Sequence, residues 1–206
     1  NEKRSSVMFG DLVGDDGLSG SRAHLPLALG VDIVGNPVIG DLASMPHLLV
    51  AGATGAGKSV GMNVMLVSLL ARCTPDKVRL ILIDPKRLEF TPYADIPHLL
   101  FPIVTNPHEV ATVLKWVAAE MELRYELMAQ LSVRNIAEYH KLDQAECFAK
   151  EREIGIHVHG MPYITIMIDE LADLMMVGGR EIETLIARIA QMARAVGMHL
   201  IIATQR

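Results

Sequence analysis

Cysteine is scarce in this sequence, and its two copies, Cys73 and Cys147, lie far apart without C-x-x-C spacing. This excludes a disulfide framework and a cysteine-based zinc site, so we expect two small thiols that are buried or half-buried. His157 and His159 have no third ligand nearby, so we predict no metal site there. The sequence also lacks a run of about 18 apolar residues, which a membrane-spanning helix needs, and it shows no signal peptide. We therefore expect a soluble chain in a reducing, cytosolic compartment.

An excess of positive charge is also missing, because the formal net charge is −5. The composition does not indicate nucleic-acid binding, although a ring can concentrate positive charge in its channel while its outer surface stays acidic. Half of the residues are hydrophobic, which suits strands that are buried on both faces. The 206 residues suffice for one α/β domain, with or without a small appendage. The chain begins at Asn1 and ends at Arg206 within an expected strand end, so we expect a fragment of a longer protein.

The chain divides into two regions of different composition. Residues 1–45 are rich in Gly, Asp and Ser and predict a small N-terminal module of strands and loops, in which Gly35-Asn36-Pro37 marks a hairpin or tight turn. Residues 46–206 alternate between apolar strands and amphipathic helices, which predicts an α/β fold with a mainly parallel central sheet. The strands are expected at 47–51, 78–84, 163–169 and 199–204, with a weaker one at 101–105.

Two helices have clear sequence signals. One begins after Asn106, which we expect to cap it, with Pro107 in the first position and Glu109 three residues after the cap. The methionines of this helix continue an apolar stripe, so we assign them to the core. The second helix is expected from 180 to 196 and ends at Gly197. On its helical wheel Arg180, Gln191 and Arg194 lie opposite the apolar stripe, and Arg188 lies on the flank.

A glycine-rich stretch predicts a phosphate site. Gly52, Gly57, Lys58 and Ser59 fit G-x-x-x-x-G-K-[ST] between an expected strand and an expected helix. The loop and the helix N-terminus would present backbone N–H groups to phosphate oxygens. We expect Lys58 to reach the β- and γ-phosphates and the Ser59 hydroxyl to bind Mg²⁺. The alternative, an accidental Lys-Ser after a turn, is disfavoured by the strand–loop–helix order. The predicted nucleotide-binding residues are Gly52, Ala53, Thr54, Gly55, Ala56, Gly57, Lys58, Ser59 and Val60.

Three further strand ends carry polar residues. "ITIMIDE" ends in Asp169, which we expect to hold Mg²⁺ through water, and Glu170, which we expect to activate the attacking water. A plain turn after this strand is the alternative, and the upstream P-loop disfavours it. Ligands of parallel sheets lie beyond the carboxyl ends of the strands, so Gln205 is predicted to sense the γ-phosphate. Asp84 and Lys86 lie at the same edge, either near the site or in a structural turn. The pattern predicts nucleotide hydrolysis but not what hydrolysis drives.

Several stretches together resemble the motor domain of the bacterial FtsK/SpoIIIE DNA translocases. They are "MPHLLVAGATGAGKSVGMN", "LIDPKRLEF", "IPHLL", "EMELRYELM" followed by "VRNIAEYH", "IDELADLMM" and "RIAQMARAVGMHLIIATQR". "LPLALGVDIVGNPVIGDLASMPH" is similar to the small module that precedes this motor, so the resemblance covers residues from about 20 to 206. Ala53, Ala56, Arg87 and Ser132 depart from the residues that the family usually has.

The resemblance implies a RecA-like P-loop NTPase that forms a homohexameric ring, is driven by ATP with Mg²⁺ and threads double-stranded DNA through its centre. It further implies a full-length protein that is anchored in the cytoplasmic membrane at the division septum, acts in chromosome partition and carries a C-terminal winged-helix module. A trans-acting arginine is implied at Arg194, with Arg188 as its rival. The DNA-contacting loops of the family lie largely beyond "ATQR", so Arg206 is the only DNA contact that we name.

Two other functions stay open at this point. A related secretion or conjugation ATPase would move protein or single-stranded DNA, whereas a nucleotide-gated scaffold would bind ATP without hydrolysing it. The presence of Lys58, Asp169 and Glu170 disfavours the scaffold. ATP hydrolysis measured with duplex and with single-stranded DNA separates the three functions.

Overall fold

The computed structural model describes residues 6–14, 16–53, 55–158 and 160–205. Thr54, His159 and Arg206 lie outside the described residues. The helices are α1 (Phe9–Val13), α2 (Lys58–Arg72), α3 (Pro107–Gln130), α4 (Ile136–Tyr139), α5 (Gln144–Ile154) and α6 (Leu171–Met192), with a 3-10 turn, η1, at Thr91–Tyr93. The strands are β1 (Pro26–Val31), β2 (Pro37–Asp41), β3 (Leu48–Ala51), β4 (Val78–Ile83), β5 (Tyr163–Ile168) and β6 (Met198–Thr204).

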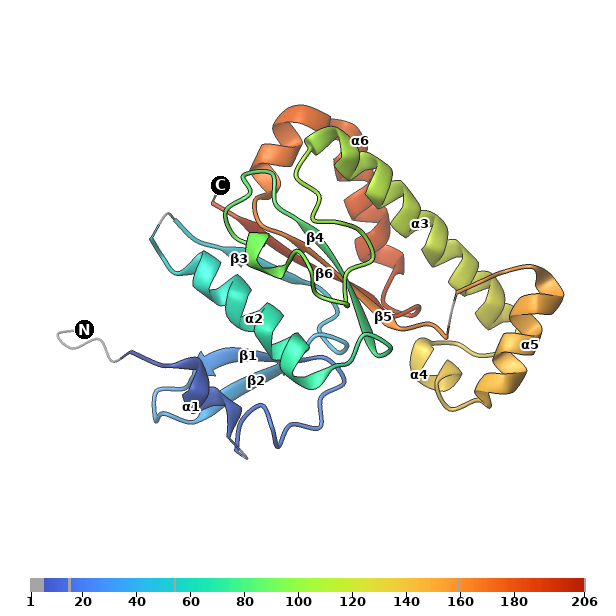
Figure 1. Cartoon of the computed structure of the whole chain (residues 1–206), viewed down its shortest axis with the longest axis horizontal. Helices are drawn as coiled ribbons and strands as arrows, with labels where there is room; N and C mark the ends of the chain where they lie inside the picture. The colour runs from blue at the N-terminus through green and yellow to red at the C-terminus, as the bar shows by residue number, and fades with distance from the viewer. Residues whose placement is uncertain (1–5, 15, 54, 159, 206) are drawn as a thin grey trace.

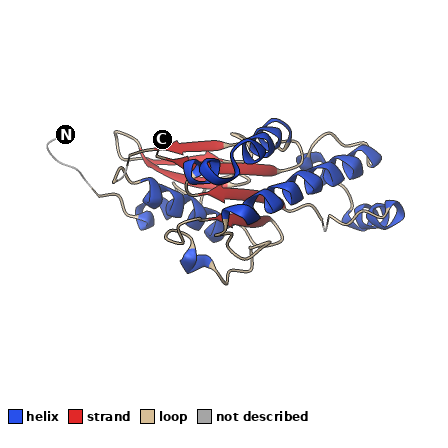
Figure 2. Ribbon diagram, turned by 90° about the horizontal axis from the view of Figure 1, so that it is seen from above, coloured by secondary structure: helices blue, strands red, loops and turns tan. Residues whose placement is uncertain are grey.

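A parallel sheet of four strands forms the centre of the molecule, in the order β3-β6-β5-β4. Strand β5 pairs on both sides and is buried along its whole length, as expected for an almost entirely apolar strand covered on both faces. Helix α2 lies on one side of the sheet, and α3 and α6 lie on the other (Figure 1). Helices α4 and α5 lie at the end of the molecule away from the carboxyl ends of the sheet strands (Figure 1), and Figure 2 shows helices beyond the strands at that end. The predicted α/β fold with a parallel sheet is confirmed.

The N-terminal region forms the predicted hairpin, in which β1 and β2 pair antiparallel. Asp32 fixes its turn, because Oδ1 accepts hydrogen bonds from the backbone N–H groups of Val34 at 2.8 Å and Asn36 at 2.9 Å. The hairpin packs on α2, where the Ser68 hydroxyl accepts a hydrogen bond from Ala28 N at 3.1 Å. Three leucines of this region join the main core: Leu25, Leu27 and Leu42. The boundary near residue 45 stays a prediction.

Helix α3 follows its sequence signals closely. The Asn106 side chain accepts a hydrogen bond from His108 N, and Pro107 begins the helix. The apolar stripe, methionines included, is buried, so the assignment of these residues to the core is confirmed. Cys73 and Cys147 are also buried and free, as predicted. Within the described residues, no helix is both long enough and apolar enough to cross a bilayer.

The strand expected at 101–105 is wrong. Within this segment only Val104 pairs with β4, in an isolated bridge to Ile83, and a second isolated bridge before it joins Leu99 to Leu80. Pro102 lies between the two bridges and has no N–H group to donate, which interrupts a regular ladder.

The helix expected at 180–196 has different bounds. Helix α6 begins at Leu171 because the Glu170 side chain caps it, accepting a hydrogen bond from Ala172 N. It bends at Gly179, whose φ of 24° and ψ of −109° are not helical, and it ends at Met192. Arg194 therefore lies in the turn that precedes β6 and not on a helical face.

Candidate functional site

The P-loop connects the carboxyl end of β3 to the first residue of α2. Gly57 caps α2 with a φ of 94°, and Gly55 has a φ of 81°, both in the left-handed region that favours glycine. These two residues curl the chain back onto the start of the helix. Left-handed glycines of this kind occur in loops whose backbone N–H groups receive phosphate oxygens.

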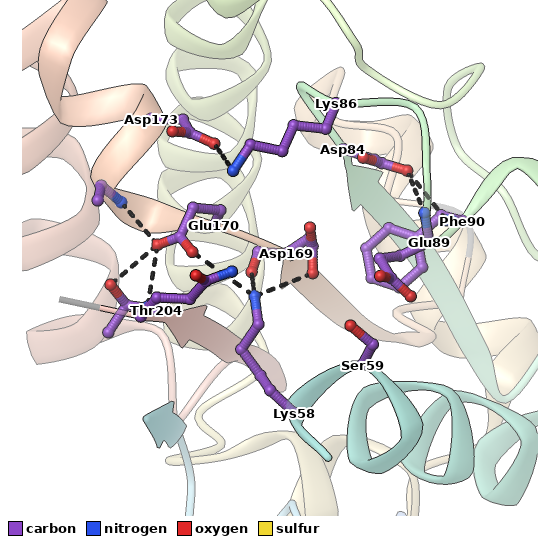
Figure 3. Close-up of polar contacts among 12 residues, drawn as sticks. Lys58, Ser59, Asp84, Lys86, Glu89, Phe90, Asp169, Glu170, Asp173 and Thr204 are labelled. Atoms are coloured by element: carbon purple, nitrogen blue, oxygen red, sulfur yellow. Dashed lines mark hydrogen bonds and ion pairs between the residues drawn. The ribbon is translucent and has the colours of Figure 1, made fainter. Parts of the chain in front are cut away.

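Lys58 joins this loop to the carboxyl end of β5. Its Nζ donates to the backbone carbonyl of Asp169 at 2.6 Å and to Asp169 Oδ1 at 3.2 Å, and it lies 3.7 Å from Glu170 Oε2. Figure 3 shows the Lys58 side chain reaching from α2 to both acids. All three side chains are at most 7% exposed. The structure thus brings together the three residues that the sequence selects from positions about 110 apart in the chain.

Glu170 is held firmly by its other carboxylate oxygen. Oε1 accepts hydrogen bonds from Ala172 N at 3.3 Å, Thr204 Oγ1 at 3.0 Å and Gln205 N at 3.2 Å. These donors fix one oxygen to α6 and to the end of β6, while Oε2 faces Lys58. Gln205 reaches the acid through its backbone N–H, and the residue itself is exposed. The Thr204 contact was not predicted. Its signal in the sequence is a hydroxyl residue at the end of an expected strand, which the fold places beside the strand that ends in Asp169 and Glu170.

Asp169 is buried beside other carboxylates, and this changes its acidity. Burial raises the pKa of Asp169, the Lys58 ammonium lowers it, and the nearby charges of Glu89 and Asp84 raise it further. The site therefore concentrates negative charge that one lysine partly neutralises, an arrangement that favours an additional cation.

Asp84 and Lys86 take different roles at this edge. The Asp84 Oδ2 accepts hydrogen bonds from Glu89 N at 2.9 Å and Phe90 N at 3.0 Å, so this oxygen supports the turn after β4. Its Oδ1 is buried and has no hydrogen-bond partner among the described residues. Lys86 forms an ion pair with Asp173 of α6 at 2.8 Å. Both residues lie at the edge of the sheet that carries Asp169 (Figure 3).

The donor set fits a magnesium ion held partly by phosphates and water. Ser59 and Asp169 supply the hard oxygen atoms that Mg²⁺ prefers, and Figure 3 shows Ser59 at the start of α2 on the side of Asp169. Among the described residues there is no group of three or more His, Cys, Asp or Glu side chains arranged around a metal. Ser59 and Val60 also line a cavity of about 430 Å³ beside α2.

Arg194 lies just before the amino end of β6, so it is at the opposite end of the sheet from Lys58, Asp169 and Glu170. It is exposed, in the turn before β6, and its Nη2 is 3.4 Å from the Ser44 carbonyl. Strand β6 spans Met198–Thr204 at about 3.3 Å per residue, so Arg194 and Glu170 of one chain are separated by roughly the length of this strand. Arg188, the rival arginine, forms an ion pair with Glu122 of α3. The structure does not bring Arg194 to the P-loop of its own chain.

Comparison with protein families gives a match over nearly the whole chain. The model of the FtsK/SpoIIIE family matches residues 15–206. The chain is 50% identical over 219 residues to the DNA translocase FtsK of Haemophilus influenzae, covering all of this chain and 41% of that protein. It is also 50% identical over 218 residues to the DNA translocase FtsK of Pseudomonas aeruginosa, covering all of this chain and 27% of that protein. The chain thus spans less than half of the length of these relatives.

Solved structures with the same architecture are P-loop ATPase domains. The cytoplasmic domain of the Thermomonospora curvata type VII secretion ATPase EccC is 26% identical, with a TM-score of 0.72, over 89% of this chain and 21% of that chain. The pCW3 conjugation coupling protein TcpA, solved with ATPgS, is 25% identical, with a TM-score of 0.69, over 90% of this chain and 49% of that chain. The chain therefore has the RecA-like P-loop ATPase fold, which confirms the predicted fold class.

Proposed function

The chain belongs to the FtsK/SpoIIIE family, and we propose that it is the ATP-hydrolysing part of a homohexameric ring that moves double-stranded DNA. The observation that carries this proposal is the buried meeting point of Lys58, Asp169 and Glu170 at the carboxyl edge of the sheet. As the relatives are longer and are named DNA translocases, we assign the chain to a longer protein that acts in chromosome partition at cell division, anchored on the cytoplasmic side of the membrane.

ATP binding is assigned to the P-loop and the start of α2. The backbone of residues 52–60 receives the phosphates, and Lys58 moves from Asp169 to the β- and γ-phosphates, because a phosphate group offers its ammonium a stronger partner than a neighbouring carbonyl. Ser59 and Asp169 are the residues that would hold Mg²⁺. When bound, this ion supplies positive charge that offsets the charge on the phosphate oxygens.

Hydrolysis is assigned to Glu170. Oε1 is fixed by three donors, whereas Oε2 faces Lys58. Once Lys58 moves to the phosphates, Oε2 is the oxygen that accepts a proton from the water that attacks the γ-phosphate. Gln205 follows the same strand end and is assigned to sensing that phosphate. Arg206, which lies outside the described residues, stays our only named DNA contact.

Arg194 is assigned to the nucleotide of the neighbouring subunit. Its separation from the P-loop of its own chain supports action in trans, since its own nucleotide is out of reach of the side chain. A finger of this kind contributes roughly a thousandfold to a hundred-thousandfold in rate. Arg188 is the weaker candidate, because its guanidinium is paired with Glu122 within the chain.

A mixing experiment tests the arginine assignment. Arg194→Ala and Lys58→Ala rings are each expected to be nearly inactive. In mixed rings some interfaces join an intact P-loop to an intact arginine, so part of the hydrolysis should return. Normal hydrolysis by Arg194→Ala alone would show that the arginine has no such role. An inactive variant that mixing does not restore would mean that the arginine acts within its own subunit or holds the ring together.

DNA-dependent hydrolysis tests the function itself. We expect duplex DNA of any sequence to stimulate ATP hydrolysis, and the binding to fall steeply with salt because the contacts are to phosphates. The resemblance in fold to a secretion ATPase and a conjugation coupling protein keeps one alternative, a motor for protein or single-stranded DNA. Stimulation by single strands only, or by neither form of DNA, would favour that alternative.

A further inference from the structure

The turn that carries Arg194 is fixed by hydrogen bonds on both sides of that residue. Within the turn, Gly197 N donates to the Arg194 carbonyl at 3.2 Å. From outside it, the Tyr125 hydroxyl donates to the Met192 carbonyl at 2.5 Å, two residues before Arg194. Arg124 Nη1 donates to the Val196 carbonyl at 3.0 Å, two residues after it. Adjacent residues of α3 thus hold both ends of one short turn.

Arg124 lies in the core, and its guanidinium contacts three different segments. It is 1% exposed, and its Nε donates to Glu120 Oε1 at 2.9 Å. Besides Val196, its Nη1 reaches the Pro162 carbonyl at 2.8 Å, next to the start of β5. Burial lowers the pKa of Arg124, and the Glu120 carboxylate opposes this effect. A guanidinium makes these contacts at once because its donors are held in a rigid plane, and lysine has no such arrangement.

Helix α4 supports the same turn from a third side. Ile136 N donates to the Ala195 carbonyl at 2.8 Å. Gly197 has a φ of 73°, and a Cβ atom there would lie 2.2 Å from Ile136 Cδ1. The left-handed φ favours glycine at this position, and a Cβ atom would also displace the terminal methyl group of Ile136. The donors from α3 and α4 lie in "RYELM" and "VRNIA", which are outside the P-loop and the acidic end of β5.

The Arg194 side chain itself has weak support. It is exposed, and its contact with the Ser44 carbonyl is long, at 3.4 Å. An exposed side chain is placed mainly by its backbone, and a catalytic group displaced by about 1 Å can lose a hundredfold in rate. The position of this guanidinium relative to a neighbouring subunit therefore depends on the turn.

We propose that Arg124 and Tyr125 are positioning residues, which hold the turn so that Arg194 reaches the nucleotide of the adjacent subunit. This inference rests on the proposed trans role of Arg194. It gives two adjacent residues of α3, the buried Arg124 and the partly exposed Tyr125, a function in one subunit that is measured at the nucleotide site of the next.

The test compares Tyr125→Phe with Arg194→Ala in assembled rings. Tyr125→Phe removes one hydroxyl, so we expect ATP affinity to stay within about twofold and turnover to fall about tenfold or more. Mixing with the Lys58→Ala variant, which keeps Tyr125 and Arg194, should restore part of the turnover. The double variant Tyr125→Phe/Arg194→Ala should be no slower than Arg194→Ala, because Tyr125 acts only through Arg194. Arg124→Lys, which keeps the charge but not the planar donors, should behave in the same way.

Tyr139→Phe is the matched control. It removes a tyrosine hydroxyl that lies 3.4 Å from Glu151 Oε1 in α5, at the same end of the molecule, and it should turn over ATP normally. Equal losses in Tyr139→Phe and Tyr125→Phe, or additive losses in the double variant, would mean a merely structural role. Normal turnover by Tyr125→Phe beside an inactive, complementable Arg194→Ala overturns only this inference. Normal turnover by Arg194→Ala overturns the trans arginine and this inference with it.

Discussion

Replacing Glu170 by glutamine is expected to separate ATP binding from ATP hydrolysis, if Glu170 is the base that we propose. Glutamine keeps a carbonyl oxygen that can accept the hydrogen bonds from Ala172, Thr204 and Gln205. The amide nitrogen replaces Oε2, which faces Lys58 at 3.7 Å, and it cannot accept a proton. The change therefore preserves the cap of α6 and the link to β6 while it removes the base.

The size of the effect follows from these contacts. Loss of a general base lowers the rate about 10²- to 10⁴-fold, which corresponds to about 2.7–5.5 kcal/mol of barrier. ATP affinity should change little, because the shorter contacts of Lys58 are to Asp169, at 2.6 and 3.2 Å. We expect a ring that binds ATP and DNA and hydrolyses very slowly.

Single-turnover hydrolysis and equilibrium ATP binding measure the two properties separately. Glu181→Gln is the control, because it makes the same chemical change in α6. The Glu181 side chain is 54% exposed and pairs with Lys115, so this variant should hydrolyse ATP normally. Normal hydrolysis by Glu170→Gln would refute the assignment of the base and direct attention to Asp84, whose Oδ1 is buried. Loss of ATP binding would instead identify Glu170 as a structural residue.

Three other predictions concern binding and stability. Lys58→Ala should abolish ATP binding. It should also lower the free energy of unfolding by about 3 kcal/mol, because it leaves two buried carboxylates without a counter-charge. Adding Asp169→Asn should restore stability but not binding, which urea unfolding and ATP titration measure separately. Burial lowers the pKa of His199 from 6.5 in the unfolded chain to about 4 in the folded protein. The unfolded chain therefore binds a proton more readily, and the free energy of unfolding falls as the pH drops from above 6.5 toward 4. Urea unfolding should show a loss of about 2 kcal/mol between about pH 7.5 and pH 5, smaller in His199→Asn, and an equal loss in that variant would contradict the assignment. Ser132 has a φ of 57° in a helix C-terminal turn that favours glycine, so Ser132→Gly should stabilise the protein by about 0.5–1 kcal/mol, and unchanged or lower stability would contradict this.

Some parts of the fold were predictable because their signals are local. The P-loop needs a strand, glycines in the left-handed region and a helix start within one short segment, and "HLLVAGATGAGKS" contains all three. The apolar strands and the cap of α3 at Asn106 are local in the same sense. Parallel strands then bring their carboxyl ends to one edge, so the meeting of Lys58 with Asp169 and Glu170 also followed from the order of elements.

Other features were not predictable because they depend on contacts between distant segments. The sequence placed Arg194 on a helix, but α6 ends at Met192 where Tyr125 and Arg124 of α3 hold the following turn. The Thr204–Glu170 hydrogen bond likewise requires β6 to lie beside β5.

The sequence by itself determined the chemistry of this protein: a phosphate loop, a pair of acids at a strand end and the membership of its family. Only the tertiary structure decided that Arg194 lies at the end of the sheet opposite its own P-loop, separated from Glu170 by the length of β6. The physical reason is that hydrophobic spacing and helix capping act over a few residues. The position of the exposed Arg194 instead depends on its backbone turn, whose carbonyls accept hydrogen bonds from side chains about 70 positions away in the chain.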